Sequence, residues 1–233
     1  MTPKYERALI VGAGDGLSAS VARAFAKAGL KIGLAARNTA KLQGLAGQLG
    51  AAVHACDAAQ QDQVDALFAA VETSLGGAPD VIVYNPSART RGPFVELDRA
   101  AVANTLAVTA YGGFLVAQAF AQRALPKKHG AILFTGASAS VKGYAQSAPF
   151  AMGKFALRGL AQSMARELQP HGIHVAHFVI DGGIRNPGRT EPADAPDSML
   201  HPDAIAQTYL HILQQDRSAW TWEVELRPWV ERF

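Results

Sequence analysis

Short apolar runs alternate along the chain with longer segments in which apolar residues recur every three or four positions. The short runs lie at 9–11, 32–34, around 53, and at 81–84, 131–134, 173–180 and 221–226. The longer segments lie at 17–28, 38–49, 64–71, about 97–125 and 148–168. The first pattern is typical of strands, and the second is typical of helices that face a core.

The repeated strand–helix order favours an α/β fold. Right-handed crossovers place successive helices on the two faces of a parallel sheet, so we predict a doubly wound parallel sheet flanked by helices on both faces. Residues 81–84 are apolar at every position, as expected for a strand that is covered on both sides. No linker or repeat divides the chain, and 233 residues fit one large domain. We therefore predict a single Rossmann-type domain over residues 1–233.

One segment, 185–203, differs in composition from the rest. Its prolines, at positions 187, 192, 196 and 202, lie among polar and acidic residues. A proline-rich insertion of this length inside a compact domain is usually a lid or a mobile loop. We predict that it covers a substrate site.

Charge and cysteine content narrow the function classes. Twenty-two Lys and Arg against 19 Asp and Glu give a formal net charge of +3, an excess too small and too dispersed to predict nucleic-acid binding. The single cysteine, Cys56, excludes an internal disulfide framework, and the histidines show no metal-ligand spacing. We predict no metal and no nucleic-acid partner.

No apolar stretch approaches the ~20 residues that we expect of a membrane span. The amino terminus runs directly into a short apolar strand, which is too short for the apolar region of a secretory signal. We therefore expect a soluble, cytoplasmic protein with no membrane partner.

A glycine-rich turn follows the first predicted strand. Gly12, Gly14 and Gly16 precede Leu17, where the first helix begins. Glycines let the backbone approach a pyrophosphate, whose charge is stabilised by the free amide groups and the dipole of the helix start. Between a first strand and a first helix, this turn indicates a dinucleotide site.

The end of the second predicted strand bears on the choice of dinucleotide. An NAD site places an acidic side chain here for the ribose 2′-hydroxyl, whereas a cation accommodates the 2′-phosphate of NADP. No carboxylate lies between Lys31 and Lys41, and Arg37 is available for a bidentate contact. NADP(H) is therefore favoured, with NAD(H) as the alternative.

Along essentially its whole length, the chain resembles the short-chain dehydrogenase/reductase family. The matching segments are 12–17, Cys56-Asp57 after the third predicted strand, Asn85-Pro86-Ser87 after the fourth, Ser138 after the fifth, Lys154 in the next helix and 181–184 after the sixth. The resemblance implies that Asp57 bonds the adenine, that Asn85 supports the central strand and the cofactor, and that Lys154 bonds the nicotinamide ribose. It also implies that Gly182, Ile184 and Asn186 grip the carboxamide.

The chain departs from the family at the positions that transfer protons. The family's catalytic tyrosine lies four positions before the lysine, where this chain has Phe150. The family's helix asparagine, part of a proton relay through water, matches Thr109; Asn104 is an alternative that requires a shift. Ser138 is available to bond a substrate oxygen, with Ser140 as the second choice.

These departures leave two hypotheses. Carbonyl reduction leaves an alkoxide that must be protonated, and Phe150 has no proton to give; such assistance is typically worth ~10²–10⁴-fold. The first hypothesis is an NADP(H)-dependent oxidoreductase with an atypical proton donor, acting on a small carbonyl or alcohol. The second is a catalytically inactive dinucleotide-binding sensor or partner subunit. Phe150 and Thr109 favour the second, whereas Ser138, Lys154 and segment 185–203 favour the first, which we prefer.

Small residues are frequent in segments 97–125 and 148–168. Small faces allow close helix packing, and members of the family pair these two helices across dyads. The resemblance therefore implies a homodimer or homotetramer.

Overall fold

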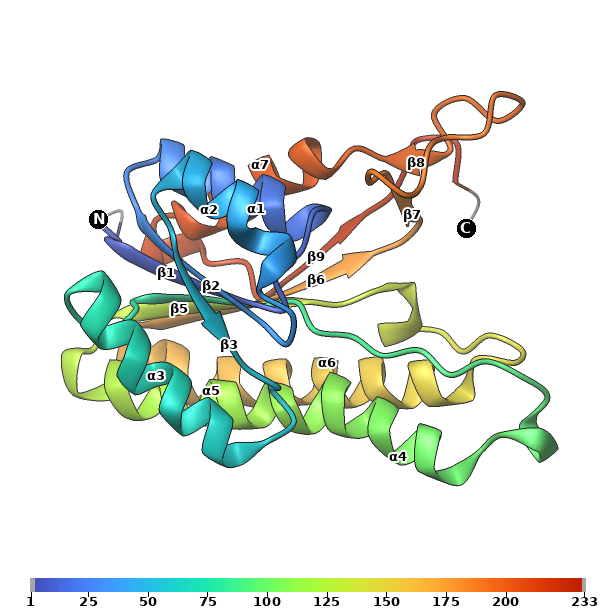
Figure 1. The fold of residues 1–233 in the computed structure, drawn as a ribbon, viewed down its shortest axis with the longest axis horizontal. Coiled ribbons are helices and arrows are strands. Elements are labelled where there is room, and N and C mark those ends of the chain that lie inside the picture. Colours follow the sequence, from blue (N-terminus) through green and yellow to red (C-terminus); the bar gives the residue numbers. More distant parts are fainter. Residues whose placement is uncertain (1–2, 232–233) are drawn as a thin grey trace.

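The computed structural model describes residues 3–231 and contains a seven-stranded parallel sheet (Figure 1). Its strand order is β3-β2-β1-β4-β5-β6-β9. The strands are β1 (Arg7–Val11), β2 (Lys31–Ala36), β3 (Ala52–Ala55), β4 (Val81–Tyr84), β5 (Gly130–Thr135), β6 (Ile173–Ile180) and β9 (Glu223–Leu226). A separate short pair joins β7 (Gly183–Ile184) to β8 (Met199–Leu200).

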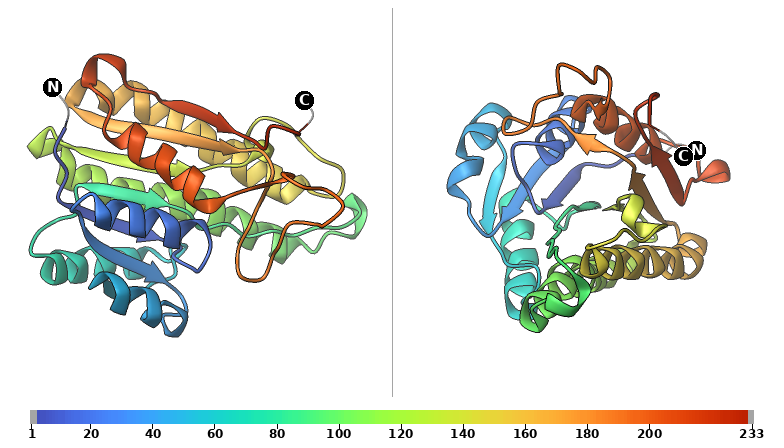
Figure 2. Two further views of the ribbon diagram at one scale, coloured as in Figure 1. Left: turned by 90° about the horizontal axis from the view of Figure 1, so that it is seen from above. Right: turned by 90° about the vertical axis from the view of Figure 1, so that its right-hand side faces the viewer.

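Helices cover both faces of this sheet (Figure 2). One face carries α1 (Leu17–Lys27), α2 (Gln43–Leu49) and α7 (Pro202–Leu213), and the other carries α3 (Gln61–Leu75), α4 (Arg99–Leu106), α5 (Gly112–Ala124) and α6 (Ala148–Leu168). Successive strand residues point to opposite faces, so Leu9 and Ile10 of β1 lie in two different apolar cores. The predicted doubly wound α/β architecture is confirmed.

Helix α7 was not predicted from the sequence. Its start overlaps the proline-rich segment, yet Ile205, Tyr209 and Ile212 recur at helical spacing and are buried. The His201 side chain caps the helix by accepting a hydrogen bond from the Asp203 amide (3.3 Å). The helix packs against α1 and completes the cover of that face.

The predicted helix over 97–125 is divided by a π-helical turn at Ala107–Tyr111. The Tyr84 hydroxyl donates a 2.5 Å hydrogen bond to the Val108 carbonyl within this turn. A π-turn adds a residue to the helix and redirects the side chains around it. It lies beside β4 and therefore near the site described below.

The same helical stretch bears on the expectation about membrane spans. Arg99–Lys127, 29 residues with a mean hydropathy of 1.5 across an 18-residue window, is long and apolar enough to cross a membrane. Core helices of folded domains share this length and composition. Here Leu115, Val116 and Phe120 are buried in the core against the sheet, which accounts for one apolar face of the stretch.

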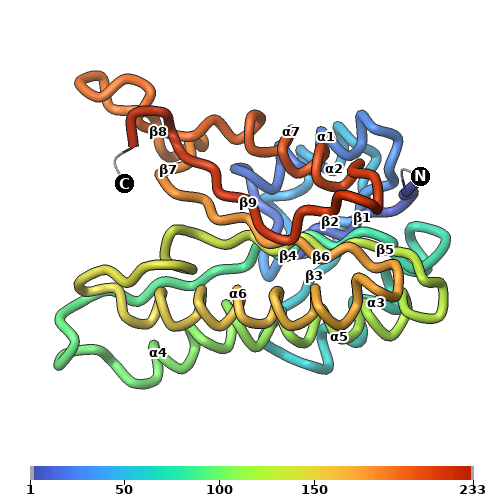
Figure 3. The backbone as a smooth tube through the Cα atoms, turned by 180° about the vertical axis from the view of Figure 1, so that it is seen from behind, coloured from blue at the N-terminus to red at the C-terminus, as the bar shows by residue number. Residues whose placement is uncertain are grey.

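The carboxyl ends of the parallel strands lie at one edge of the sheet. The direction of winding reverses between β1 and β4, and open α/β sheets bind their ligands in the crevice at such a point. Figure 3 shows two segments projecting beyond this edge, the loop between β7 and β8 on one side and the chain leading into α4 on the other. The topology therefore places a candidate site between them.

Candidate active site

The glycine turn between β1 and α1 is fixed by the loop after β4. Gly12 has φ +76°, and a Cβ there would lie 2.6 Å from the Pro86 nitrogen, so only glycine fits. The Asn85 side-chain amide donates hydrogen bonds to the Gly12 carbonyl (3.2 Å) and to the Ser18 hydroxyl (2.8 Å). Asn85 thus joins the turn to the central strand.

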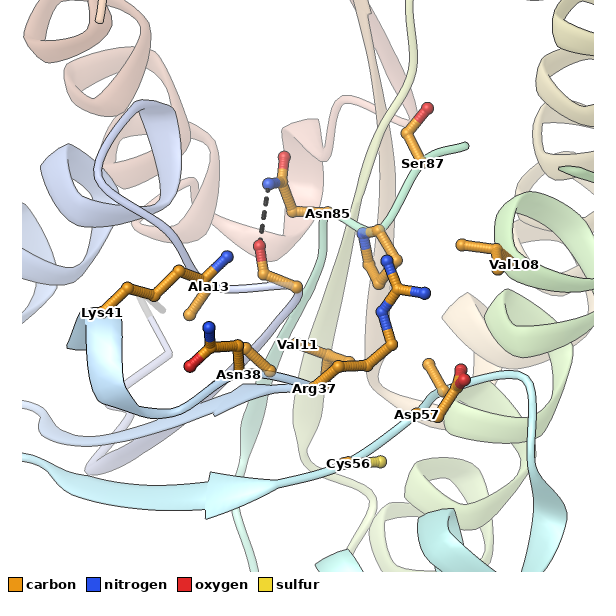
Figure 4. Close-up of a pocket in the computed structure, with 14 residues that line it drawn as sticks. Val11, Ala13, Arg37, Asn38, Lys41, Cys56, Asp57, Asn85, Ser87 and Val108 are labelled. Atoms are coloured by element: carbon orange, nitrogen blue, oxygen red, sulfur yellow. Dashed lines mark hydrogen bonds between the residues drawn. The ribbon is translucent and has the colours of Figure 1, made fainter. Parts of the chain in front are cut away.

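Beside this turn lies a cavity of about 350 Å³ (Figure 4). In Figure 4, Arg37 extends from the end of β2 across the cavity, and Lys41 lies on the side of the glycine turn. The Lys41 Nζ is 3.7 Å from the place that a Cβ on Gly14 would occupy. Within residues 3–231, neither Arg37 nor Lys41 forms an ion pair with a carboxylate. The cavity therefore offers two cations to an anionic group.

Sequence reasoning singled out Arg37 but missed its neighbours Asn38 and Lys41, which line the same cavity. The signal for Lys41 was its spacing, because a lysine four positions after Arg37 returns to the cavity through the short turn that precedes α2. Asp57 lines the cavity from the end of β3. Its Oδ1 accepts the Ala59 amide (3.0 Å), and its Oδ2 accepts no hydrogen bond from residues 3–231.

A second cavity, of about 280 Å³, shares Asn85 and Ser87 with the first. The two together follow the carboxyl edge of the sheet. Predicted site residues that line the second cavity are Gly16, Leu17, Asn85, Phe150, Lys154, Gly182, Ile184 and Asn186. Those that line the first are Gly12, Arg37, Asp57 and Asn85. Gly14, Thr109 and Ser138 line neither.

Lys154 is the buried cation of the second cavity. It is 2% exposed, and its Nζ donates a 2.7 Å hydrogen bond to the Thr135 carbonyl at the end of β5. Burial, together with the positive charge of Arg89, lowers the pKa of Lys154 to about 7. Near neutral pH, the Lys154 side chain therefore exchanges a proton between its ammonium and its neutral amine form.

The ring of Phe150 lies close to both of these basic side chains. Phe150 is 7% exposed; the Arg89 guanidinium carbon lies 4.2 Å, and the Lys154 Nζ 5.9 Å, from the centroid of its ring. Cations are attracted to the negative face of an aromatic ring, which accounts for the position of Arg89. Arg89 was not identified from the sequence.

Thr109 lies in the π-turn and acts on the loop after β4. Its hydroxyl accepts a hydrogen bond from the Ala88 amide (3.3 Å), and its Cβ would lie 3.0 Å from a Cβ on Gly153. Thr109 is buried, whereas Asn104, the alternative considered from the sequence, is exposed on α4. The threonine therefore supports the loop and packs closely against α6.

The serines after β5 lie beside the second cavity. Ala137 lines it, but Ser138 does not. Ser140 is fully buried, and its Oγ accepts the Ala137 amide (3.2 Å). Of the two candidate hydroxyls, that of Ser138 is the more accessible, because the Ser140 hydroxyl is buried and hydrogen-bonded within the turn.

The loop after β6 contributes the outer wall. Asn186 lies over the glycine turn, with its Cβ 3.5 Å from the place of a Cβ on Gly16, and a backbone bridge pairs it with Arg189. Asp181 does not line the cavity, and its Oδ2 lies 3.4 Å from both Lys142 Nζ and Arg227 Nη2. The loop thus presents uncharged and positive groups to the site.

Comparison with known proteins shows which protein family has this arrangement of strands and helices. The family model for short chain dehydrogenases matches residues 6–191. A short-chain dehydrogenase from Rhodopseudomonas palustris has 34% sequence identity and a TM-score of 0.82, covering 97% of this chain and 100% of its own. A metagenomic short-chain oxidoreductase in complex with NADP has 27% identity and a TM-score of 0.82, with 96% and 97% covered. The (+)-borneol dehydrogenase 1 of Salvia officinalis is 31% identical over 186 residues, 76% of this chain and 70% of its own. This chain belongs to the short-chain dehydrogenase family.

Proposed function

We propose that this protein is an NADP(H)-dependent oxidoreductase that acts on a small carbonyl or alcohol through an active site without the family's tyrosine. The observation that carries the proposal is the continuity of the two cavities. One presents Arg37 and Lys41 without a carboxylate partner, and the other contains the buried Lys154. NAD(H) remains the alternative cofactor.

The residues of both cavities fit a nicotinamide dinucleotide. The tight turn at Gly12, closed against Pro86, precedes the amides at the start of α1, and Arg37 with Lys41 suits a 2′-phosphate. Asp57 would bond the adenine, and Lys154 the ribose of the nicotinamide half. Gly14, Gly16 and Leu17 would face the pyrophosphate, and Gly182, Ile184 and Asn186 the carboxamide. When bound, such a cofactor supplies or accepts the hydride.

The proposal also includes a single domain over residues 1–233 and a substrate lid formed by residues 185–203. Asn186 and Arg189, both within 185–203, line the second cavity, which supports the proposal that this segment covers a substrate there. Ser138 and Lys154 would contact the substrate and cofactor, with Phe150 and Thr109 in the places of the tyrosine and asparagine. The alternative, a catalytically inactive NADP(H)-binding sensor or partner subunit, is favoured by Phe150, Thr109 and the apolar Ala137.

Arg37→Gln is expected to raise the Kd for NADPH about 10–50-fold and that for NADH less than about threefold, because a charge-assisted bond to the 2′-phosphate is lost only for NADPH. A thermal-shift screen with the four nicotinamide cofactors, followed by fluorescence titration, measures this. Lys41→Gln should act in the same direction. Arg23→Gln, on the exposed face of α1, is the control. Equal losses for both cofactors in Arg37→Gln would remove the NADP assignment.

The lowered pKa of Lys154 predicts proton uptake when NADPH binds. At pH 8 the lysine of the free protein is mostly neutral, because its pKa is about 7. Phosphates brought into a cavity lined by cations favour the charged form and raise that pKa, so binding takes up close to one proton. Calorimetry at pH 8 in buffers of different ionisation enthalpy measures the number. The Lys154→Met variant should take up correspondingly fewer protons when NADPH binds. Identical proton uptake by the two proteins would contradict the assignment of the proton to Lys154.

We also propose a homodimer or homotetramer in the cytoplasm. Members of this family act on small molecules and commonly form oligomers. Tyr111 and Phe114, from the α5 side, and Met152 and Phe155, from α6, are large apolar side chains that are 41–50% exposed. A second copy of the chain that covered them would remove this apolar surface from water.

A further inference from the structure

Basic side chains line the second cavity without an opposing charge. Arg89, Lys154 and Arg189 line the second cavity, and among the described residues that line it none is a carboxylate. Burial lowers the pKa of Arg89, and the charges of Arg91 and Arg189 lower it further. Arg89 and Arg189 would therefore attract an anion that entered this cavity.

The two carboxylates that flank residues 182–190, those of Asp181 and Glu191, form ion pairs with basic side chains that do not line the second cavity. Asp181 pairs with Lys142 and Arg227. Glu191 pairs with Arg185, and the Arg185 Nη2 lies 2.6 Å from the Glu191 Oε2. The positive charge facing Phe150 is therefore not neutralised by the neighbouring acidic side chains of the loop.

Hydrogen bonds hold the loop on both sides of Arg89. On one side, the Ala88 amide donates to the Thr109 hydroxyl (3.3 Å). On the other, the Thr90 and Thr105 hydroxyls are hydrogen-bonded at 2.9 Å. The guanidinium itself lies 4.2 Å from the Phe150 ring centroid and forms no hydrogen bond or ion pair within residues 3–231. Its donors are thus available to a ligand in the cavity beside the ring.

We propose that Arg89, assisted by Arg189, binds an anionic group of the substrate, so that the substrate is a small carbonyl or alcohol carrying a carboxylate or a phosphate. This inference rests on the proposed function, since it assigns the cavity beside Lys154 to the substrate. The guanidinium offers a planar pair of donors that matches both kinds of anion. The pyrophosphate of the cofactor is expected elsewhere, at the amides of the glycine turn and the start of α1.

The test measures binding to the NADP⁺-saturated protein by calorimetry, so it does not depend on turnover. The probes are two matched pairs, levulinate against methyl levulinate and dihydroxyacetone phosphate against dihydroxyacetone. In each pair the carbonyl is kept and the charge removed. We expect at least one anion to bind ten or more times more tightly than its neutral counterpart, and the pair that shows the preference distinguishes carboxylate from phosphate.

Arg89→Gln should abolish the preference for the anion, and Arg89→Lys should retain part of it. Arg91→Gln is the matched control, because Arg91 belongs to the same loop but does not line the cavity. No preference in either pair, or a preference that survives Arg89→Gln, would overturn the proposal. An equal loss of the anion preference in Arg91→Gln would also overturn it, because such a loss indicates a general attraction by nearby positive charge rather than binding by Arg89.

The affinity for NADP⁺ is measured first for each variant. Arg89→Gln should leave it within about threefold of the unaltered protein; a loss as large as that for the anion would assign Arg89 to the cofactor instead. Failure of the unaltered protein to bind any nicotinamide cofactor would count against the proposed function itself. The two failures are therefore distinguishable.

Discussion

Replacing Phe150 by tyrosine is expected to raise the turnover of carbonyl reduction with NADPH by about 10²–10⁴-fold. The added hydroxyl would extend from a ring that already lines the second cavity. Arg89 and Lys154, whose charged groups lie 4.2 and 5.9 Å from the ring centroid, would favour the phenolate and so lower the pKa of the new phenol. A phenol tuned in this way can protonate the alkoxide that reduction leaves.

The measurement is steady-state NADPH oxidation with a panel of aldehydes and ketones that includes the charged and neutral probes named above. Phe155→Tyr is the matched control, because Phe155 lies on the same helix but is 44% exposed to solvent. Adding Lys154→Met to Phe150→Tyr should remove most of the gain. If Phe150→Tyr binds NADPH but turns over substrate no faster than the unaltered protein, the hypothesis of an inactive dinucleotide-binding protein is favoured.

The sequence was most informative where function depends on residues close together in the chain. The glycine turn, Arg37 and the spacing between Phe150 and Lys154 are local patterns, and each residue's place on a strand end or helix followed from hydrophobic periodicity. The alternation of strands and helices was enough to predict the sheet and both helical layers, because parallel connections have one handedness.

What the sequence did not predict depends on contacts between distant segments. Arg89 stacks on Phe150, 61 positions later, only because the loop after β4 is anchored to Thr109 in a π-turn. A π-turn has no simple periodic signature, and this one interrupts a segment that reads as a single helix. Helix α7 was missed because the proline-rich composition before it masked its start, although Pro202 occupies the first turn, where proline is tolerated.

A second large effect is expected from Glu223→Gln, which should lower the free energy of unfolding at pH 7 by about 2–3 kcal/mol. Glu223 on β9 accepts two hydrogen bonds from Arg158 of α6, at 2.6 and 2.7 Å, and its Oε2 lies 3.1 Å from His177 Nδ1 on β6. The variant removes the carboxylate while keeping its shape, which leaves Arg158 without its charge partner. For a chain of this size, the expected fall in Tm is roughly 4–12 °C.

The same cluster gives the loss a pH dependence with a definite sign. Burial opposes ionisation of Glu223, but Arg158 and His177 hold the pKa of that carboxyl below its usual value. Its stabilising contribution is therefore full above the unfolded-state pKa of about 4.5 and is lost as pH falls through the lower folded-state pKa. Burial lowers the pKa of His177 to about 4, so this imidazole adds a further loss of stability between about pH 6.5 and 4 in both proteins.

Urea unfolding at pH 7 and at pH 4 separates these contributions. The difference between the unaltered protein and Glu223→Gln should be largest at pH 7 and smaller at the lower pH, because only the unaltered protein has a carboxylate to protonate. Glu6→Gln is the control; Glu6 pairs with Arg7 on the surface, is 61% exposed and should change stability by less than about 0.5 kcal/mol. Because Arg158 lies one helical turn after Lys154, loosening this cluster should also weaken NADPH binding. A Glu223→Gln protein with unchanged stability at both pH values would show that α6 is positioned by its apolar face alone.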